Sequence, residues 1–120
     1  MSKSKERGIQ GEDLIATELE QQGMHIVKRN YRKQFGEIDL IAQCNDLLIF
    51  VEVKLRYSAR IDLAELINST KQQRIIMTAK AFCAQYDQLE KICRFDVALI
   101  DYSTGVPDIT YIPNAFTESD

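Results

Sequence analysis

The spacing of apolar residues predicts two helices. The first runs from about residue 4 or 5 to residue 22, because apolar residues recur at helical spacing, and Gly23 is expected to end it. The second is expected from residue 71 to about residue 86, with Ser69 or Thr70 as its N-cap. The expected buried side of this helix consists of Ile75, Ile76, Ala79, Phe82, Cys83 and Tyr86.

Five apolar segments have the composition of strands. They are residues 24–32, 37–43, 47–56, 94–101 and 109–113. Gly36 is expected to supply a turn before the second strand, and residues 44–46 to close a hairpin. Pro113 indicates a sheet edge or a strand end. The order α-β-β-β-α-β-β predicts an α/β fold in three layers, a mixed sheet with helices packed on its faces.

Length and composition favour a single folded domain. The chain has 120 residues, of which 45% are hydrophobic and 28% charged. We expect one domain over residues 1–120, with its core at about 6–113. There is no run of about 20 apolar residues and no apolar signal segment at the N-terminus, so we expect no membrane partner. The single His and three scattered Cys have no zinc-site spacing, and an odd thiol count suits the cytoplasm.

Charge is distributed unevenly along the chain. The formal net charge of −3 argues against a generally basic nucleic-acid-binding protein. Yet residues 25–80 contain ten basic and six acidic residues, a local excess of four positive charges. This excess has two interpretations: a positive face for a polyanion, or a solvated surface with chance clustering.

Charged residues also stand inside the apolar strands. By alternation, Glu52 and Lys54 share one face of the third strand with Leu48 and Phe50. A hairpin closed at residues 44–46 places Asp39 opposite Glu52. Two carboxylates opposed on a sheet destabilise it, and a divalent cation would offset their repulsion.

The first helix adds a carboxylate to the same region. Glu12 precedes Ile15 and Leu19 by three and seven residues, which places it on the stripe facing the sheet. Gly8 and Gly11 weaken this helix, and close approach of another backbone or a ligand would explain them.

Purely structural interpretations of these charges stay open. Glu52 and Lys54 could form an ion pair, Glu12 could lie at the rim of the core, and Asp39 could pair with Arg56 or Arg32.

The spacing D-x(12)-E-x-K from Asp39 through Glu52 to Lys54, after a helix that carries a Glu, resembles the PD-(D/E)xK nuclease superfamily. Ile38 stands where that pattern has Pro. The segments GEDLIATELEQQGMHIVKRNYR, GEIDLIA, FVEVKLR, TKQQR, CRFDV and ITYIPNAF resemble the YraN family of bacterial proteins over about residues 6–116. That family is similar to archaeal Holliday-junction resolvases, which have a restriction-endonuclease-like fold.

The resemblance implies Mg²⁺- or Mn²⁺-dependent cleavage of phosphodiester bonds. Asp39, Glu52 and the backbone carbonyl of Val53 would be metal ligands, and Glu12 would complete the catalytic site as a metal or water ligand. Lys54 would position the attacking water and stabilise developing charge. The sequence departs from many relatives at YSARIDLAELI, residues 57–67, which leaves substrate contacts there open.

Five basic residues are candidates for binding nucleic acid: Arg32, Lys33, Arg56, Lys71 and Arg74. Lys71 and Arg74 open the second helix, where phosphate could meet its positive end, although plain solvation would also explain them. For the aromatic residues Tyr31, Phe35 and Tyr57 we expect packing in the core or at its rim.

The sequence therefore predicts a nuclease-like protein whose partner is nucleic acid, DNA in the first place, and whose substrate could be branched or structured. A homodimer is expected from the resolvase resemblance alone. Two alternatives stay open: a non-catalytic nucleic-acid-binding module, and a protein-interaction module whose charges are structural ion pairs. The sequence pI of about 5.2 favours the second alternative.

Overall fold

The computed structural model describes residues 3–57 and 67–118. The elements follow one another as α1 Lys3–Gln21, β1 His25–Lys33, β2 Gly36–Cys44, β3 Leu47–Arg56, α3 Ser69–Gln85, β4 Ile92–Asp101 and β5 Asp108–Phe116. Within the described residues this is the predicted α-β-β-β-α-β-β order, and β3 has the predicted bounds.

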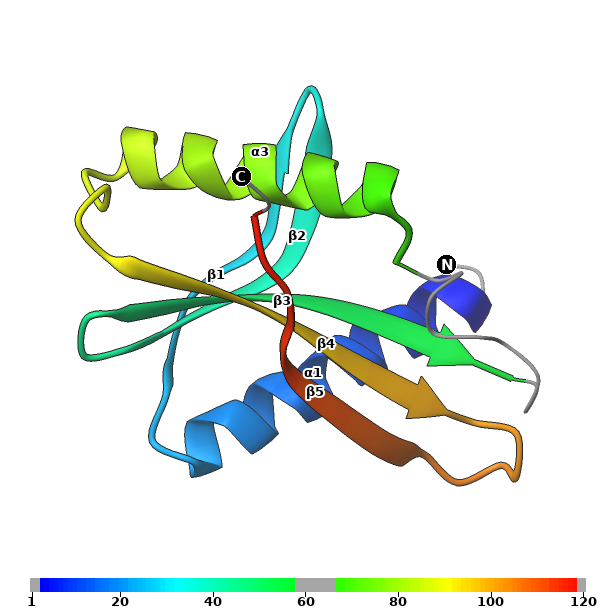
Figure 1. The fold of residues 1–120 in the computed structure, drawn as a ribbon. Coiled ribbons are helices and arrows are strands. Elements are labelled where there is room, and N and C mark those ends of the chain that lie inside the picture. Colours follow the sequence, from blue (N-terminus) through cyan, green and yellow to red (C-terminus); the bar gives the residue numbers. More distant parts are fainter. Residues whose placement is uncertain (1–2, 58–66, 119–120) are drawn as a thin grey trace.

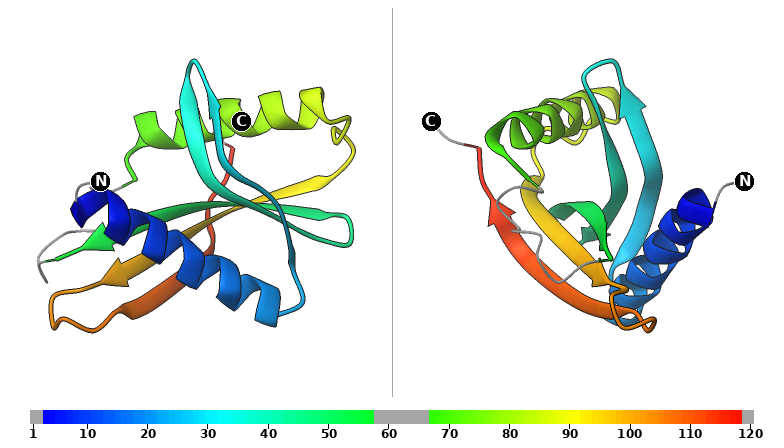
Figure 2. Two further views of the ribbon diagram at one scale, coloured as in Figure 1. Left: turned by 180° about the vertical axis from the view of Figure 1, so that it is seen from behind. Right: turned by 90° about the vertical axis from the view of Figure 1, so that its right-hand side faces the viewer.

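The strands form one mixed sheet in the order β1-β2-β3-β4-β5. Neighbouring strands are antiparallel except β3 and β4, which are parallel. Parallel neighbours need a long crossover, and α3 lies in that connection. Figure 1 and Figure 2 show α3 on one face of the sheet and α1 on the other. This confirms the predicted α/β class, and the three layers are consistent with a restriction-endonuclease-like fold.

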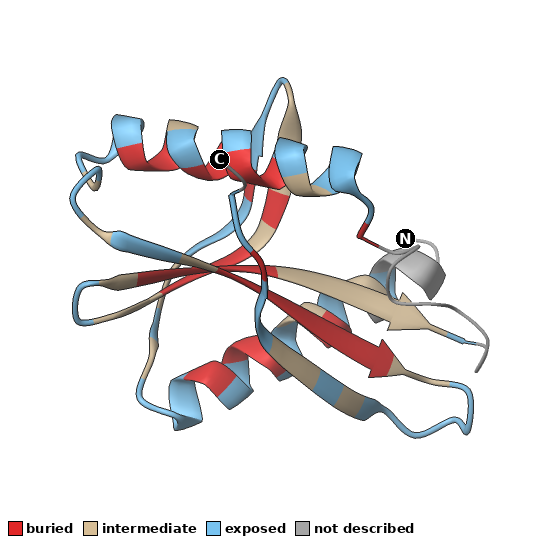
Figure 3. Ribbon diagram, in the orientation of Figure 1, coloured by how far each residue is buried: buried red, intermediate tan, exposed pale blue. Residues whose placement is uncertain are grey.

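The sheet separates two apolar cores (Figure 3). Leu48 and Phe50 of β3 belong to the core under α3, whereas Ile49 and Val51 belong to the core under α1. Both faces of β3 are covered, which explains its nearly continuous apolar sequence. The alternation predicted for β3 is therefore confirmed.

Helix α3 differs from the prediction at both ends. Its N-cap is Asn68, not Ser69 or Thr70, and the Asn68 side chain accepts a hydrogen bond from the Lys71 N–H. Tyr86 was expected on the buried side; it is the C-cap residue, its ring packs against Phe82, and it is 41% exposed. Thr78 is fully buried, which the apolar pattern did not indicate, and its hydroxyl donates to the Arg74 carbonyl at 2.7 Å.

The structure changes the role expected for Gly36 and confirms one of the two expected for Pro113. Gly36 begins β2 without a positive φ. A Cβ there would lie 2.9 Å from Thr78 Oγ1 and 3.2 Å from the Arg74 carbonyl oxygen. The turn itself lies at residues 34–35, directly before this glycine, and Gly36 allows β2 to touch α3. Pro113 lies on an edge strand as predicted but does not end it, since β5 continues to Phe116.

The two glycines of α1 are not equivalent. A Cβ at Gly11 would lie 3.0 Å from Ile100 Cδ1 and from Leu55 Cδ2, so close packing against the sheet explains this residue. A Cβ at Gly8 would meet nothing within 4 Å, so the expected close approach is wrong there.

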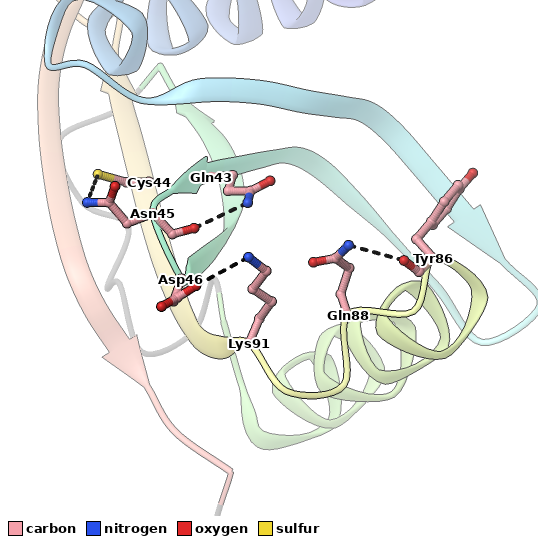
Figure 4. A network of polar contacts seen from close by, with 7 residues as sticks. All are labelled: Gln43, Cys44, Asn45, Asp46, Tyr86, Gln88 and Lys91. Carbon is pink, nitrogen blue, oxygen red and sulfur yellow. Dashed lines mark hydrogen bonds and ion pairs between the residues drawn. The ribbon is translucent and has the colours of Figure 1, made fainter.

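The turn between β2 and β3 contacts the loop that follows α3 (Figure 4). Lys91 Nζ lies 3.5 Å from Asp46 Oδ1, and the Ile92 N–H donates to the Asp46 carbonyl. These contacts hold the turn of the β2–β3 hairpin against this loop. Among the described helices, none is long and apolar enough to cross a membrane. Predictions for residues 58–66 lie outside the described residues.

Candidate functional site

The candidate site lies where β2 separates from β3. The ladder between these strands pairs Leu40 with Val51, the register that places Asp39 opposite Glu52 as predicted. Beyond this pair the Val53 N–H donates to the Asp39 side chain, with 2.8 Å from nitrogen to Oδ2. Asp39 therefore replaces a backbone carbonyl at the end of the ladder. Figure 1 shows the β1–β2 hairpin turning from this place towards α3.

The strand bends at Asp39. Ile38 packs in the core under α3, whereas Leu40 packs in the core under α1, although regular alternation would put both on one face. On β1 the residue between the partners of Ile38 and Leu40 is Asn30, which has a φ of 52°. The bend carries the tip of the hairpin to α3 and leaves Asp39 at the opening between the strands.

The environment of Asp39 disfavours its charge. Burial, followed by the hydrogen-bonding contact and charge of Glu52, raises the pKa of Asp39 to about 8, although the Val53 N–H opposes the shift. The side chains of Asp39 and Glu52 therefore lie close together, as the sequence predicted. Such a pair holds a proton at neutral pH unless a cation balances it.

Lys54 is the cation next to this pair. Its Nζ lies 3.7 Å from Glu52 Oε1, and both side chains are only partly exposed. The ion pair that the sequence left open as a structural interpretation is therefore present. The other interpretation, an ion pair of Asp39 with Arg32 or Arg56, is wrong, because Arg32 pairs with Glu37 at 3.2 Å and Arg56 with Asp101 at 2.8 Å.

Glu12 reaches the site from α1. Burial raises the pKa of its carboxyl, and the charge of Asp39 adds to the shift, while a hydrogen bond from Asn30 and the charge of Arg29 lower it. Arg29 Nη2 lies 3.9 Å from Glu12 Oε1 and 2.7 Å from Asp13 Oδ1. The structure thus brings Asp39, Glu52 and Lys54 together, with Glu12 near enough for the charge of Asp39 to act on it.

Sequence reasoning missed two partners of this site. Arg29 was noted only as part of the positive middle of the chain, and Asn30 not at all. Nothing in the sequence pattern marks Asn30, since its role depends on the bend opposite Asp39.

The five candidate nucleic-acid contacts separate into groups. Arg32, Lys33 and Arg74 line one groove beside the hairpin tip. Lys71 is exposed in the first turn of α3. Arg56 is held by Asp101 and is not among the residues lining the groove.

A second buried carboxylate, Asp96 on β4, has a different character. It is 1% exposed and accepts hydrogen bonds from Arg94 Nε at 2.9 Å and Nη2 at 2.8 Å. The Tyr111 hydroxyl and the Asn114 N–H also donate to it. Its charge is fully compensated, so Asp96 ties β4 to β5. Asp96 and Asp39 give the same signal in the sequence, an Asp within an apolar strand. Only their hydrogen-bond and charge partners in the structure distinguish them.

Two adjacent carboxylates are a donor set that suits Mg²⁺ or Mn²⁺. Among the described residues, no three His, Cys, Asp or Glu side chains converge closely enough to form a metal cage by themselves. Mg²⁺ commonly uses one or two carboxylates and keeps several waters, so the Asp39–Glu52 pair matches its chemistry. The repulsion between the adjacent Asp39 and Glu52 carboxylates, which adds to burial in raising the pKa of Asp39, is the observation that favours a cation here.

Comparison with known proteins yields one family. Residues 11–100 match the family described as "Uncharacterised protein family UPF0102". A UPF0102 protein of Geobacter metallireducens is 40% identical over 114 residues, covering 94% of this chain and 93% of the relative. One from Nitrosomonas europaea is 40% identical over 120 residues, covering 99% and 100%. A third, from Dictyoglomus thermophilum, is 39% identical over 116 residues, covering 94% and 98%.

Proposed function

We propose that this chain, which belongs to UPF0102, the family also called YraN, is a metal-dependent nuclease. The family description assigns no activity, so the proposal is drawn from the site itself. It would hydrolyse phosphodiester bonds in nucleic acid with Mg²⁺ or Mn²⁺. The supporting observation is the contact between Asp39 and Glu52, with Lys54 beside them, at the opening between β2 and β3.

The residues that would hold the ion are Asp39 and Glu52, together with the main-chain carbonyl of Val53. Glu12 would bind the ion or one of its waters from α1. A bound Mg²⁺ polarises a phosphate oxygen and lowers the pKa of a bound water. The ion would thereby offset the repulsion between the adjacent Asp39 and Glu52 carboxylates.

The remaining work would fall to the side chains of the protein. The Lys54 ammonium donates hydrogen bonds in several directions, so it can contact both a water and a phosphate oxygen. Its present partner is Glu52, and a carboxylate engaged by a cation would leave the ammonium free to turn to the phosphate. Glu12 would hold a water through its carboxylate oxygens.

The test is cleavage of a labelled panel of linear duplex, single-stranded, forked and four-way-junction DNA, and of RNA. Each substrate is incubated with Mg²⁺, Mn²⁺ or EDTA. We expect cleavage only with a metal ion, and loss of cleavage in Asp39→Asn and Glu52→Gln. The matched control is Asp46→Asn, a carboxylate with a 91% exposed side chain on the β2–β3 turn, which should cleave like the wild type. Cleavage that survives Asp39→Asn, or that proceeds in EDTA, contradicts the proposal.

One observation favours a second candidate, a non-catalytic module that binds nucleic acid or protein. Lys54 balances Glu52, and Arg29 balances Glu12, without any metal ion. On this alternative the protein binds nucleic acid in a salt-dependent manner, or binds a protein partner, and turns over none of the panel with either metal.

Three finer expectations come from the sequence. The family resemblance favours DNA over RNA and branched over linear substrates, and it suggests a homodimer, whereas the odd thiol count and the missing signal segment suggest a cytoplasmic location. The panel decides the first. Light scattering at micromolar concentration decides the second, since a monomer mass would contradict a dimer. Fractionation of the producing cells decides the third.

A further inference from the structure

A groove of about 650 Å³ lies between the tip of the β1–β2 hairpin and α3. Three cationic side chains line it, those of Arg32, Lys33 and Arg74, against one carboxylate, that of Glu37. Glu37 is paired with Arg32 at 3.2 Å. The groove is therefore positive, although the chain as a whole has a net charge of −3.

Apolar side chains stand among these cations. Phe35, in the hairpin turn, is partly exposed, and Met77, on α3, is 46% exposed, and both line the groove. The sequence predicted packing in the core or at its rim for Phe35, and this explains why Phe35 is partly buried. It does not explain why Met77, which lines the same groove, is exposed. An aromatic ring and a thioether between cations provide contact area for a flat ring that carries a negative group.

The groove is held in shape by a tight seam. The Gly36 backbone touches α3, where a Cβ would lie 2.9 Å from Thr78 Oγ1 and 3.2 Å from the Arg74 carbonyl oxygen. Thr78 is itself fully buried. The hairpin tip and α3 therefore form a preorganised pair of walls, which lowers the entropy cost of binding.

The groove adjoins the carboxylate site. Glu37 stands two residues before Asp39 on β2, and its charge acts on both Glu12 and Asp39. A nucleic-acid strand that placed a phosphate at Asp39 and Glu52 would have its neighbouring nucleotide within reach of this groove.

We propose that the groove binds one unpaired nucleotide next to the phosphate at the carboxylate site, with its base against Phe35 and Met77 and its phosphate on Arg32 and Arg74. Bases in a duplex are covered on both faces by their neighbours, so only an unpaired base can lie against these side chains. The inference rests on the nucleic-acid part of the proposed function. It specifies the substrate as nucleic acid with an unpaired segment at the site.

The test is fluorescence anisotropy with a labelled oligothymidine of about 12 nucleotides, compared with a blunt duplex of the same length. EDTA is present, so binding is measured without cleavage. We expect the wild-type protein to prefer the single strand. Met77→Ala and Phe35→Ala should each weaken single-strand binding about fivefold or more and leave duplex binding within about twofold. Arg74→Gln should weaken both and reduce the salt slope by about 1.

The matched control is Lys80→Gln. Lys80 is on α3 like Arg74, but it pairs with Glu118 and lines a different cavity. Its loss should leave single-strand binding within about twofold of the wild type. Circular dichroism verifies that each variant is folded, and Met77→Ala removes a side chain that is already half exposed, so it tests the groove even if Phe35→Ala unfolds.

Equal affinity for single strand and duplex, or wild-type single-strand binding by folded Met77→Ala and Phe35→Ala, overturns the inference. The outcome is separable from that of the proposed function. Selective single-strand binding without cleavage in Mg²⁺ or Mn²⁺ supports the groove and contradicts the hydrolysis. Metal-dependent cleavage that Met77→Ala and Phe35→Ala leave unchanged on every substrate supports the hydrolysis and contradicts the groove.

Discussion

Replacing Asp96 by alanine should destabilise the protein more than any change in the candidate site. Asp96 is 1% exposed, and its carboxylate accepts hydrogen bonds from Arg94, Tyr111 and Asn114. Removing one member of a buried ion pair costs about 3–5 kcal/mol, because the remaining charge and polar groups stay buried without partners. The Arg94 side chain is 27% exposed and can reach water, so the lower part of this range is expected.

Urea unfolding followed by circular dichroism measures this cost. A loss of about 3 kcal/mol is a large part of the roughly 5–15 kcal/mol of a typical domain. With a slope of about 1–3 kcal/mol per molar urea, the midpoint should fall by about 1–3 M. Tyr111→Phe removes one donor and keeps the ion pair, so its cost should be about 1 kcal/mol.

The control is Asp46→Ala. Asp46 is also in an ion pair, with Lys91, but its side chain is 91% exposed, so its loss should cost less than about 1 kcal/mol. An Asp96→Ala protein within about 1 kcal/mol of the wild type would refute the reasoning that the buried network holds β4 and β5 together.

Three further predictions concern the site and the groove. Because the pKa of Asp39 is 3.8 when unperturbed and about 8 in the metal-free fold, the folded state binds more protons over that interval. Stability should therefore fall as the pH rises from about 4 to 8, and Asp39→Asn should remove this part of the fall in urea titrations at several pH values. Mn²⁺ should raise the melting temperature of the wild type and raise that of Glu52→Gln much less, and equal shifts would count against a metal ion at this place. Gly36→Ala should cost about 1–3 kcal/mol of stability, because its Cβ would press on Thr78. Gly8→Ala should not destabilise the fold, because nothing lies within 4 Å of the added Cβ. Differential scanning calorimetry compares the two variants, and equal melting points would contradict the tight seam between β2 and α3.

Contrasting effects are therefore expected of two aspartates that look alike in the sequence. Asp39 and Asp96 both interrupt apolar strands. Asp96 has a guanidinium, a hydroxyl and a backbone N–H, and its loss should weaken the fold. Asp39 has one backbone donor and an adjacent carboxylate. The neutral side chain of Asp39→Asn should therefore relieve the repulsion with Glu52 at pH 8. Uncompensated charge is what distinguishes a candidate functional carboxylate from a structural one.

The sequence alone determined the order of the elements, the bounds of β3, the register between β2 and β3 and the identity of the central charges. β3 has the bounds that its apolar run predicted, and Asp39 stands opposite Glu52 because the turn at residues 45–46 is local and the two-residue period then sets every pair. The helix cap was missed, since Asn68, Ser69 and Thr70 are all good caps and only the backbone direction selects Asn68.

Only the tertiary structure decided how the hairpin leaves the sheet. The bend at Asp39 depends on Ile38 packing under α3 and Leu40 under α1, contacts between segments far apart in the chain. That bend leaves Asp39 where its charge acts on Glu12 of α1, and it brings Gly36 against α3 to form the groove. A pattern of apolar and polar residues specifies which face of an element is buried, but not which partner buries it, because that depends on the packing of the whole chain.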